Sequence, residues 1–159
     1  MHFRAWVWTG AGSHEEVCEM ATEGNKAIIR RSVDEFWNTG NVEIMPEIYH
    51  PEYQGHDPGG MHSGDLAQFT ETCKAVFAAF SGVEVIIHEL LEDGDRVIKR
   101  WTARSKHTGE FMGIPASGNE VEFTGINIYR IADGKIIEAW CNSDTLGFMQ
   151  AIGVVPKMG

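Results

Sequence analysis

The sequence has few positive charges for its length. Lys and Arg number 13 against 23 Asp and Glu, so the 159-residue chain carries a formal net charge of −10. Nucleic-acid binding requires clustered Lys and Arg against the phosphates, and anionic membrane surfaces also attract basic segments. The charge balance therefore predicts a protein that binds neither nucleic acid nor a membrane surface.

Cysteine is scarce, and long apolar runs are absent. Cys18, Cys73 and Cys141 form no CxxC pair and no metal-spaced set, so neither a disulfide framework nor a metal site is predicted. No apolar run approaches the roughly 18 residues that a membrane helix requires, and the first residues make a poor secretory signal. These absences favour a cytoplasmic protein with reduced thiols.

The sequence also has no internal repeat, no low-complexity tract and no linker long enough to separate two domains. Residues 1–24 are predicted to form an irregular N-terminal extension, and residues 25–159 a single domain with its own core. No P-loop, GxSxG, HExxH or dinucleotide-binding motif occurs. Motifs therefore give no support to the nucleotide-binding, serine-hydrolase or metalloprotease classes.

The periodicity of apolar residues changes along the chain. Helical spacing predicts three helices, within residues 24–41, 42–51 and 62–82. After Gly82 the period falls to about two, which predicts four long strands in two hairpins. Helices followed by a run of antiparallel strands indicate an α+β fold, with the helices packed on one side of a curved sheet.

A wide twisted sheet of this kind predicts a cavity. Helices laid across its concave face need not fill it, so we expect a cone-shaped pocket lined by every second strand residue. Such concave, mostly apolar sites bind small molecules. The outer face of the strands between residues 83 and 142 carries too many apolar residues for free exposure, which predicts a homodimer formed through the sheet.

The most specific motifs lie in the second half of the chain: HTGEFMGIPASG, RIADGKIIEAW and DTLGFMQAIG. FWNTGN, HPEY and GHDP add weaker matches in the first half. Over roughly residues 25–153 the sequence resembles the SnoaL-like polyketide cyclases of the NTF2-like superfamily. The resemblance implies an NTF2-like cone-shaped barrel, with three helices packed on a strongly curved, mainly antiparallel sheet. It also implies a homodimer, no metal and no organic cofactor.

The resemblance implies a reaction class as well. Characterised family members close a ring on a polyketide ester by intramolecular aldol condensation. They use a pocket Asp on the last strand as acid and base, assisted by a His on the preceding strand. Aligned on the shared DGK turn, Cys141 stands at the position of that Asp and Asn127 at the position of that His. The sequence thus lacks the family's acid–base groups at both positions.

The turn of the last hairpin decides which of its residues face the cavity. A type I turn over residues 132–134 with a Gly bulge places Asn127, Ala139 and Cys141 on one face. A plain two-residue turn places Asn127 beside Trp140 instead. The bulged turn is favoured because it agrees with the family's pocket positions, and Trp140 and Cys141 then point to opposite faces.

Three polar residues are candidates for catalysis: His56, Asn127 and Asp144. His56 belongs to the GHDP segment, titrates near neutral pH and is the first choice for a general base. The alternative is a surface His beside a turn-forming Asp57. Asn127 is expected to stabilise a substrate oxygen or enolate. Asp144 either takes part in the chemistry or caps the last helix.

Seven further residues are predicted to contact the ligand or to form the wall of its pocket. For Trp101 the alternative role is packing in the core of the dimer. For His107 the alternative role is a hydrogen bond within a loop. Cys141 is not expected to act as a nucleophile, because the sequence places no His beside it and an apolar strand raises the pKa of a thiol. The seven residues are Phe36, Trp37, Tyr53, Phe77, Trp101, His107 and Cys141.

Two functions agree with these residues. The first is an enzyme that transfers protons on a hydrophobic carbonyl or polyketide-type compound, as a cyclase, isomerase or dehydratase does. The second is a non-catalytic protein that binds a hydrophobic small molecule on the same scaffold. A third, epoxide hydrolysis, needs an Arg and paired Asp residues in the pocket. It is disfavoured, because Arg100 and Arg104 have acidic neighbours that indicate ion pairs.

Overall fold

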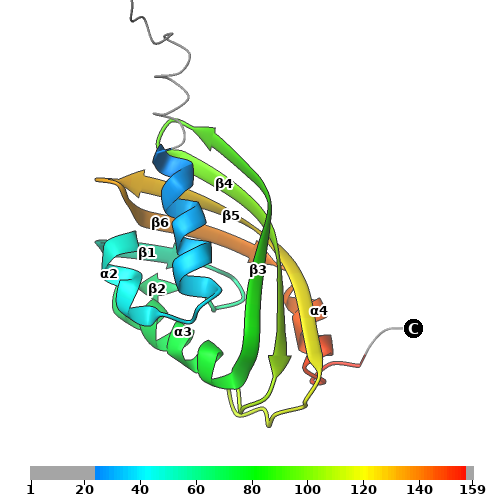
Figure 1. Ribbon diagram of the computed structural model, residues 1–159. Coiled ribbons are helices and arrows are strands. Elements are labelled where there is room, and N and C mark those ends of the chain that lie inside the picture. The colour runs from blue at the N-terminus through cyan, green and yellow to red at the C-terminus, as the bar shows by residue number, and fades with distance from the viewer. Residues whose placement is uncertain (1–23, 157–159) are drawn as a thin grey trace, which may run out of the picture.

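The computed structural model describes residues 24–156, in which one sheet curves around a group of helices (Figure 1). The predicted extension over residues 1–24 lies outside these residues, apart from residue 24. Residues 24–31 are helical and lead into the π-helix η1 (Ser32–Trp37). The remaining elements are η2 (Val42–Ile44), α2 (Met45–Ile48), β1 (Tyr49–His56), β2 (Gly64–Asp65), α3 (Leu66–Ala79), β3 (Phe80–Asp93), β4 (Arg96–His107), β5 (Glu120–Ala132), β6 (Lys135–Ser143) and α4 (Thr145–Ala151).

The sheet has six strands in the order β2-β1-β6-β5-β4-β3, and only the β1–β6 pair is parallel. The predicted α+β cone with a strongly curved, mainly antiparallel sheet is confirmed. The sequence did not reveal β1 and β2. The helix predicted to run to Pro51 ends at Ile48, where β1 begins. Pro, Glu and Gly interrupt the alternation in β1, so its period of two is hard to recognise. No helix among residues 24–156 is long and apolar enough to cross a membrane.

Helices cover the concave face of the sheet (Figure 1). Asp65 begins α3 with a capping box, in which its carboxylate accepts from the amide of Gln68 and the Gln68 side chain accepts from the amide of Asp65. Phe69 of α3 and Phe36 of η1 are fully buried and pack edge-on against Tyr49 of β1. This aromatic core joins the helices to the β1 end of the sheet, while β3, β4 and Phe123 of β5 line a pocket.

The last hairpin differs from the predicted turn, although its register is the favoured one. Asp133 and Gly134 both have positive φ, 51° and 73°, and form a plain two-residue turn. The expected bulge in the turn is therefore wrong. The extra residue is Ile137, within β6, where the pairing shifts by one. That bulge restores the favoured pairing, in which Asn127 lies opposite Cys141.

Gly125 of β5 makes room for the indole of Trp101, its partner on β4. A Cβ at position 125 would collide with the six-membered ring of this buried indole. Gly125→Ala should therefore lower the free energy of unfolding by about 1–3 kcal/mol, the usual effect of overpacking. Urea denaturation measures the change. Gly24→Ala is the control, because position 24 is helical and no atom lies within 4 Å of a Cβ there. Equal stabilities of the Gly125→Ala variant and the wild type would contradict the prediction.

Candidate functional site

Three polar residues form a row across the concave face of the sheet. Lys99 of β4 pairs with Asn127 of β5, and Asn127 pairs with Cys141 of β6. All three are buried, with exposed fractions of 3%, 1% and 0%. Strand alternation explains why their side chains share the inner face. Of the three, Lys99 lines the apolar pocket described below, whereas Asn127 and Cys141 are buried beside it.

The orientation of the Asn127 amide follows from its neighbours. The indole N–H of Trp101 donates to Asn127 Oδ1, and the thiol of Cys141 donates to the same oxygen over 3.6 Å. An indole nitrogen only donates, so the oxygen of the amide must face it. Asn127 Nδ2 is buried and has no hydrogen-bond partner among the described residues. A buried donor without a partner suits a ligand oxygen.

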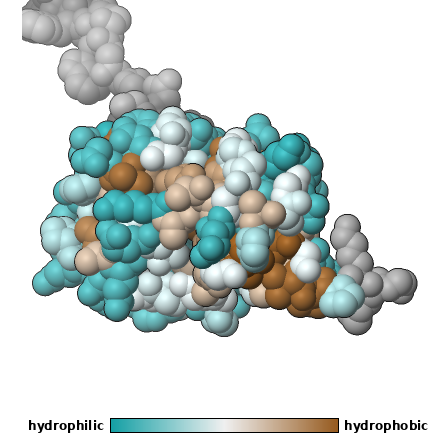
Figure 2. All heavy atoms as spheres, turned by 90° about the horizontal axis from the view of Figure 1, so that it is seen from below, coloured by the Kyte–Doolittle hydropathy of each residue, from teal (hydrophilic) through white to brown (hydrophobic). Residues whose placement is uncertain are grey.

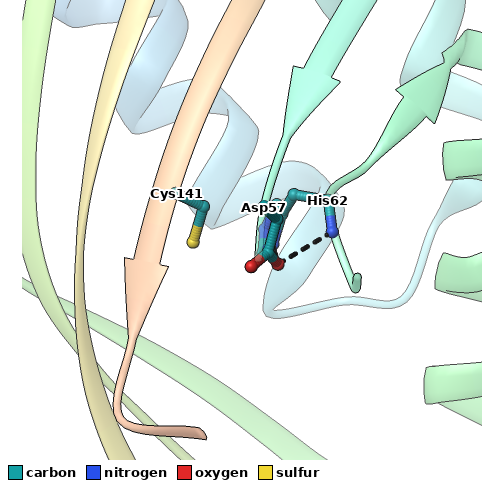
Figure 3. Close-up of side chains that lie close together, drawn as sticks. All are labelled: Asp57, His62 and Cys141. Carbon is teal, nitrogen blue, oxygen red and sulfur yellow. Dashed lines mark hydrogen bonds and ion pairs between the residues drawn. The ribbon is translucent and has the colours of Figure 1, made fainter. Parts of the chain in front are cut away.

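A loop after β1 brings an acid–base pair to this row. The carboxylate of Asp57 accepts hydrogen bonds from the backbone amides of Gly59, over 2.7 Å, and His62, over 3.0 Å. These bonds fold the loop so that His62 Nδ1 lies 3.3 Å from Asp57 Oδ2. One ligand atom from each of Asp57, His62 and Cys141 lies within 4.8 Å of the other two (Figure 3). Residues from β6 and from the loop thus meet at one point.

The pair is electrostatically coupled. Burial opposes the protonation of His62, but its hydrogen bond to Asp57 and the nearby sulfur of Cys141 outweigh burial and raise its pKa to about 9. Burial of Asp57 acts to raise its pKa, but hydrogen bonds from His62 and Gly59 outweigh it and lower the pKa of the carboxyl. At neutral pH the pair is therefore an imidazolium–carboxylate ion pair.

An apolar pocket adjoins the row and the pair, and it holds about 680 Å³ of empty volume, including the open solvent at its mouth. His62 and Lys99 contribute polar groups to a lining made mostly of aromatic and aliphatic side chains. Such a surface suits a hydrophobic small molecule with a few polar atoms. The lining consists of Trp37, Met61, His62, Cys73, Val76, Phe80, Val83, Val85, Lys99, Trp101, Ala103, Arg104, Ser105, Phe123 and Phe148.

A second hollow lies between the loop after β1, residues 111–114 and α4. It shares Met61, Phe123 and Phe148 with the first pocket, so these three side chains separate the two spaces. Figure 2 looks at the molecule from below and shows apolar side chains gathered next to the C-terminal residues drawn in grey. Asp57 lines this second hollow, whereas His62 lines the first pocket.

Some predicted site residues lie elsewhere. Trp37 and Trp101 line the pocket, whereas Phe36, Tyr53 and Phe77 do not and belong to the core on its helical side. Tyr53 and Phe36 are fully buried there. For these three residues, core packing rather than ligand contact is the observed role.

His107 is also buried, but it serves a loop. Its Nδ1 atom lies 3.0 Å from the hydroxyl of Ser117, and its ring stacks on Phe80 with centroids 4.9 Å apart. These contacts match the alternative role that the sequence left open for His107, a hydrogen bond within a loop.

His56 does not face the pocket, contrary to expectation. It lies on the outer face, where its side chain is half exposed, stacks on Trp140 and places Nε2 3.0 Å from Glu138 Oε1. Adjacent residues of an extended segment point in opposite directions, and Asp57 is the one that points inward. Asp144 caps α4 by accepting from the amide of Gly147 over 2.8 Å, and it is exposed.

Sequence reasoning missed His62 and Lys99, and undervalued Asp57. Lys99 had a usable signal, because it is a charged residue at an inward position between Val97 and Trp101 in the period-two pattern of β4. His62 had none. It lies in a loop of Pro and Gly residues, and only the folding of that loop brings it beside Cys141.

Asp57, His62 and Cys141 are also a set of possible metal ligands. Carboxylate, imidazole and thiolate are the donor types that Zn²⁺ takes in catalytic sites. Both oxygens of Asp57 already accept hydrogen bonds from backbone amides. These hydrogen bonds and the contact with His62 fix the carboxylate as the acidic member of an acid–base pair.

Comparison with known proteins places this site in a family. The sequence pattern of the SnoaL-like polyketide cyclases matches residues 27–152. The aklanonic acid methyl ester cyclase DnrD of Streptomyces peucetius is 31% identical over 133 residues, which cover 79% of this chain and 88% of that protein. The nogalonic acid methyl ester cyclase of Streptomyces nogalater is 27% identical, with 74% and 89% covered. The chain belongs to the SnoaL-like polyketide cyclase family, as the sequence resemblance predicted.

Solved structures agree with the fold. TsrD from Streptomyces laurentii superimposes with a TM-score of 0.74 at 22% identity, over 84% of this chain and 97% of that one. A SnoaL-like polyketide cyclase from Agrobacterium tumefaciens gives a TM-score of 0.66 at 17% identity, over 81% and 98%. At these identities the likeness supports the cone-shaped architecture only.

The ion pair predicts an abnormal titration of His62. Its NMR signal, assigned with a His62→Gln variant, should titrate with a midpoint near 9, and Asp57→Asn should lower that midpoint. The folded pKa lies above the unfolded value of about 6.5. The stability that protonation contributes is therefore fully present below pH 6.5 and lost as pH rises through 9. Asp57→Asn should lose less stability over this interval. A wild-type midpoint near 6.5 would rule out the coupling.

Proposed function

We propose that this protein is an enzyme that transfers protons on a hydrophobic carbonyl compound of polyketide type, with the Asp57–His62 pair as its acid–base group. The observation that carries the proposal is the position of His62. Its imidazole lines an apolar pocket, contacts Asp57 and lies beside Cys141. The proton-transfer group would then come from the loop after β1 rather than from β6.

The geometry assigns a role to each group. Neutral His62 accepts a proton from an acidic C–H next to the substrate carbonyl, and its protonated form returns a proton to carbon or oxygen. Asp57 holds the tautomer and stabilises the imidazolium that forms. Asn127 Nδ2, which has no hydrogen-bond partner among the described residues, donates to the enolate oxygen that develops. A raised pKa of His62 means that the basic form becomes more abundant as the pH approaches 9.

The substrate class rests on the pocket and on the relatives. The lining is mostly apolar, and the curated relatives are named as cyclases of aklanonic and nogalonic acid methyl esters. A polyketide-type ester or ketone matches both. A cytoplasmic location agrees with the two described cysteines, Cys73 and Cys141, which are free thiols.

Epoxide hydrolysis receives no support from the site. Arg100 and Arg104 form ion pairs with Glu89 and Glu122, and all four side chains are more than half exposed. Asp57 is the one Asp among the described pocket residues, so no paired Asp residues face the ligand. Non-catalytic binding of the same class of ligand is the alternative that activity measurements decide.

We also propose a homodimer through the outer face of the sheet. Leu91, Ile98, Ile128 and Trp140 are register neighbours on successive strands and form one apolar row. Leu91 and Ile98 are exposed, and Ile128 and Trp140 are partly exposed. A continuous apolar strip of this kind favours contact with a second sheet.

Replacement of the proposed base should reduce catalysis strongly. His62→Gln is expected to lower the rate by about 10²- to 10⁴-fold, the usual contribution of a positioned general base. Deuterium exchange at the acidic C–H of an apolar β-keto methyl ester measures the rate above the buffer background. Asp57→Asn should lower it less, because the imidazole remains.

His56→Gln is the matched control for that experiment. His56 lies on the outer face, so its replacement should leave the exchange rate unchanged. A rate in His62→Gln equal to that of the wild type would remove His62 as the base. If the wild type binds the ester but exchanges no proton, the chain is a binding protein.

The dimer predicts a mass of twice the 17.7 kDa chain in light scattering. Ile98→Lys places a charge in the apolar row and should shift the mass toward that of one chain, because a buried unpaired charge opposes association. Leu146→Lys is the control, since Leu146 is an exposed apolar residue of α4, away from the sheet. A single-chain mass for the wild type at micromolar concentration would exclude the dimer.

A further inference from the structure

Lys99 is a buried cationic residue that the acid–base mechanism leaves without a role. Its side chain lines the pocket and is 3% exposed. Its Nζ atom lies 5.7 Å from the ring centroid of Trp101 and 5.4 Å from that of Tyr129. Among residues 24–156, no carboxylate lies within 4.0 Å of it and no hydrogen bond holds it. By contrast, exposed Lys74 pairs with Glu71.

A buried ammonium without an anionic partner is unfavourable. Two aromatic rings offset part of this cost by cation–π attraction, but they do not replace a counter-ion. Burial lowers the pKa of Lys99 to about 8, with Cys141 acting in the opposite direction. The unprotonated, nucleophilic amine is therefore more abundant near neutral pH than it is for a solvent-exposed lysine, whose pKa is about 10.4.

The surroundings of Lys99 suit a reaction with a carbonyl carbon. Its partner in the sheet register is Asn127, whose Nδ2 atom is a buried donor with no hydrogen-bond partner within residues 24–156. A ligand carbonyl between the two would meet a nucleophile at carbon and a hydrogen-bond donor at oxygen. His62 lines the same pocket and supplies a group that accepts and returns protons.

We propose that Lys99 forms an imine with a ketone carbonyl of the pocket ligand, so that the site activates its substrate covalently as well as by proton transfer. The inference rests on the proposed function for the class of ligand, a polyketide-type ketone. The reactive amine would be that of Lys99 on β4, which is the direct register partner of Asn127 on β5.

The reaction balances without a further reagent. The lone pair of Nζ forms a bond to the carbonyl carbon, and the π electrons move to oxygen, which receives a proton from nitrogen. The resulting hydroxyl leaves as water when the C=N bond forms with loss of the second N–H proton. The imine withdraws electrons from the adjacent carbon once protonated. Its α-proton is then removed more easily, and the product is an enamine.

A 1,3-diketone tests the proposal, because its imine tautomerises to a stable enaminone that absorbs in the near ultraviolet. The full-length protein is incubated with 2,4-pentanedione, and peptide mass spectrometry locates the adduct. We expect rapid formation of the enaminone at Lys99. Lys99→Arg keeps the charge and should abolish the rapid phase, while Lys106→Arg, an exposed position on the same strand, should not. Lys99→Met provides a second variant if the first does not fold.

The outcomes separate this inference from the proposed function. An adduct at Lys99 supports the imine, even where the deuterium exchange assay detects no proton transfer. Proton exchange that depends on His62, with no adduct at Lys99, overturns the imine and leaves the proposed function intact. Equal rapid labelling of the wild type and Lys99→Arg also overturns it. A third result would overturn it as well: the diketone binds rapidly but no enaminone forms. Lys99 would then act only as a positive charge that attracts anionic ligands.

Discussion

The register of β4, β5 and β6 is the constraint on which the site depends. It aligns Lys99, Asn127 and Cys141 in one row on the concave face. Side chains alternate along a strand, so a slip of β6 by one residue would turn Cys141 to the outer face and Trp140 to the inner face. The two-residue turn alone would produce that slip, and the bulge at Ile137 prevents it. One extra residue in β6 thus decides which side chains a ligand meets.

The second constraint is the cost of polar groups in an apolar pocket. Asp57 is buried, and it remains ionised because two backbone amides and the imidazole of His62 surround it. The same bonds fold the loop and hold the imidazole over the pocket. Lys99 has no such compensation from a carboxylate. Lys99 lines the pocket, and Asn127 Nδ2, next to it in the sheet register, is a buried donor without a hydrogen-bond partner among the described residues.

In the proposed mechanism, a pair from the loop after β1 takes the role that the family resemblance gives to an Asp on the last strand. Cys141 and Asn127 occupy the strand positions at which the resemblance leads one to expect the Asp and the His. Asp57 and His62 approach the same point from the loop after β1. The proposed acid–base group therefore lies near the strand positions that the family resemblance indicates, but its residues come from a different segment of the chain. Geometry at a pocket, rather than position in a motif, defines the chemistry.

The amino-acid sequence alone was enough for the α+β class, the curved antiparallel sheet and the family. These follow from the periodicity of apolar residues and from motifs such as RIADGKIIEAW. Both depend on interactions within short segments of the chain, so they can be recognised in the sequence. The tertiary structure alone decided the site. His56 and Asp57 are neighbours in the chain, yet alternation sends one outward and the other inward. His62 meets Cys141 across 79 residues of chain because a loop folds around one carboxylate, and no local pattern carries information on such a contact.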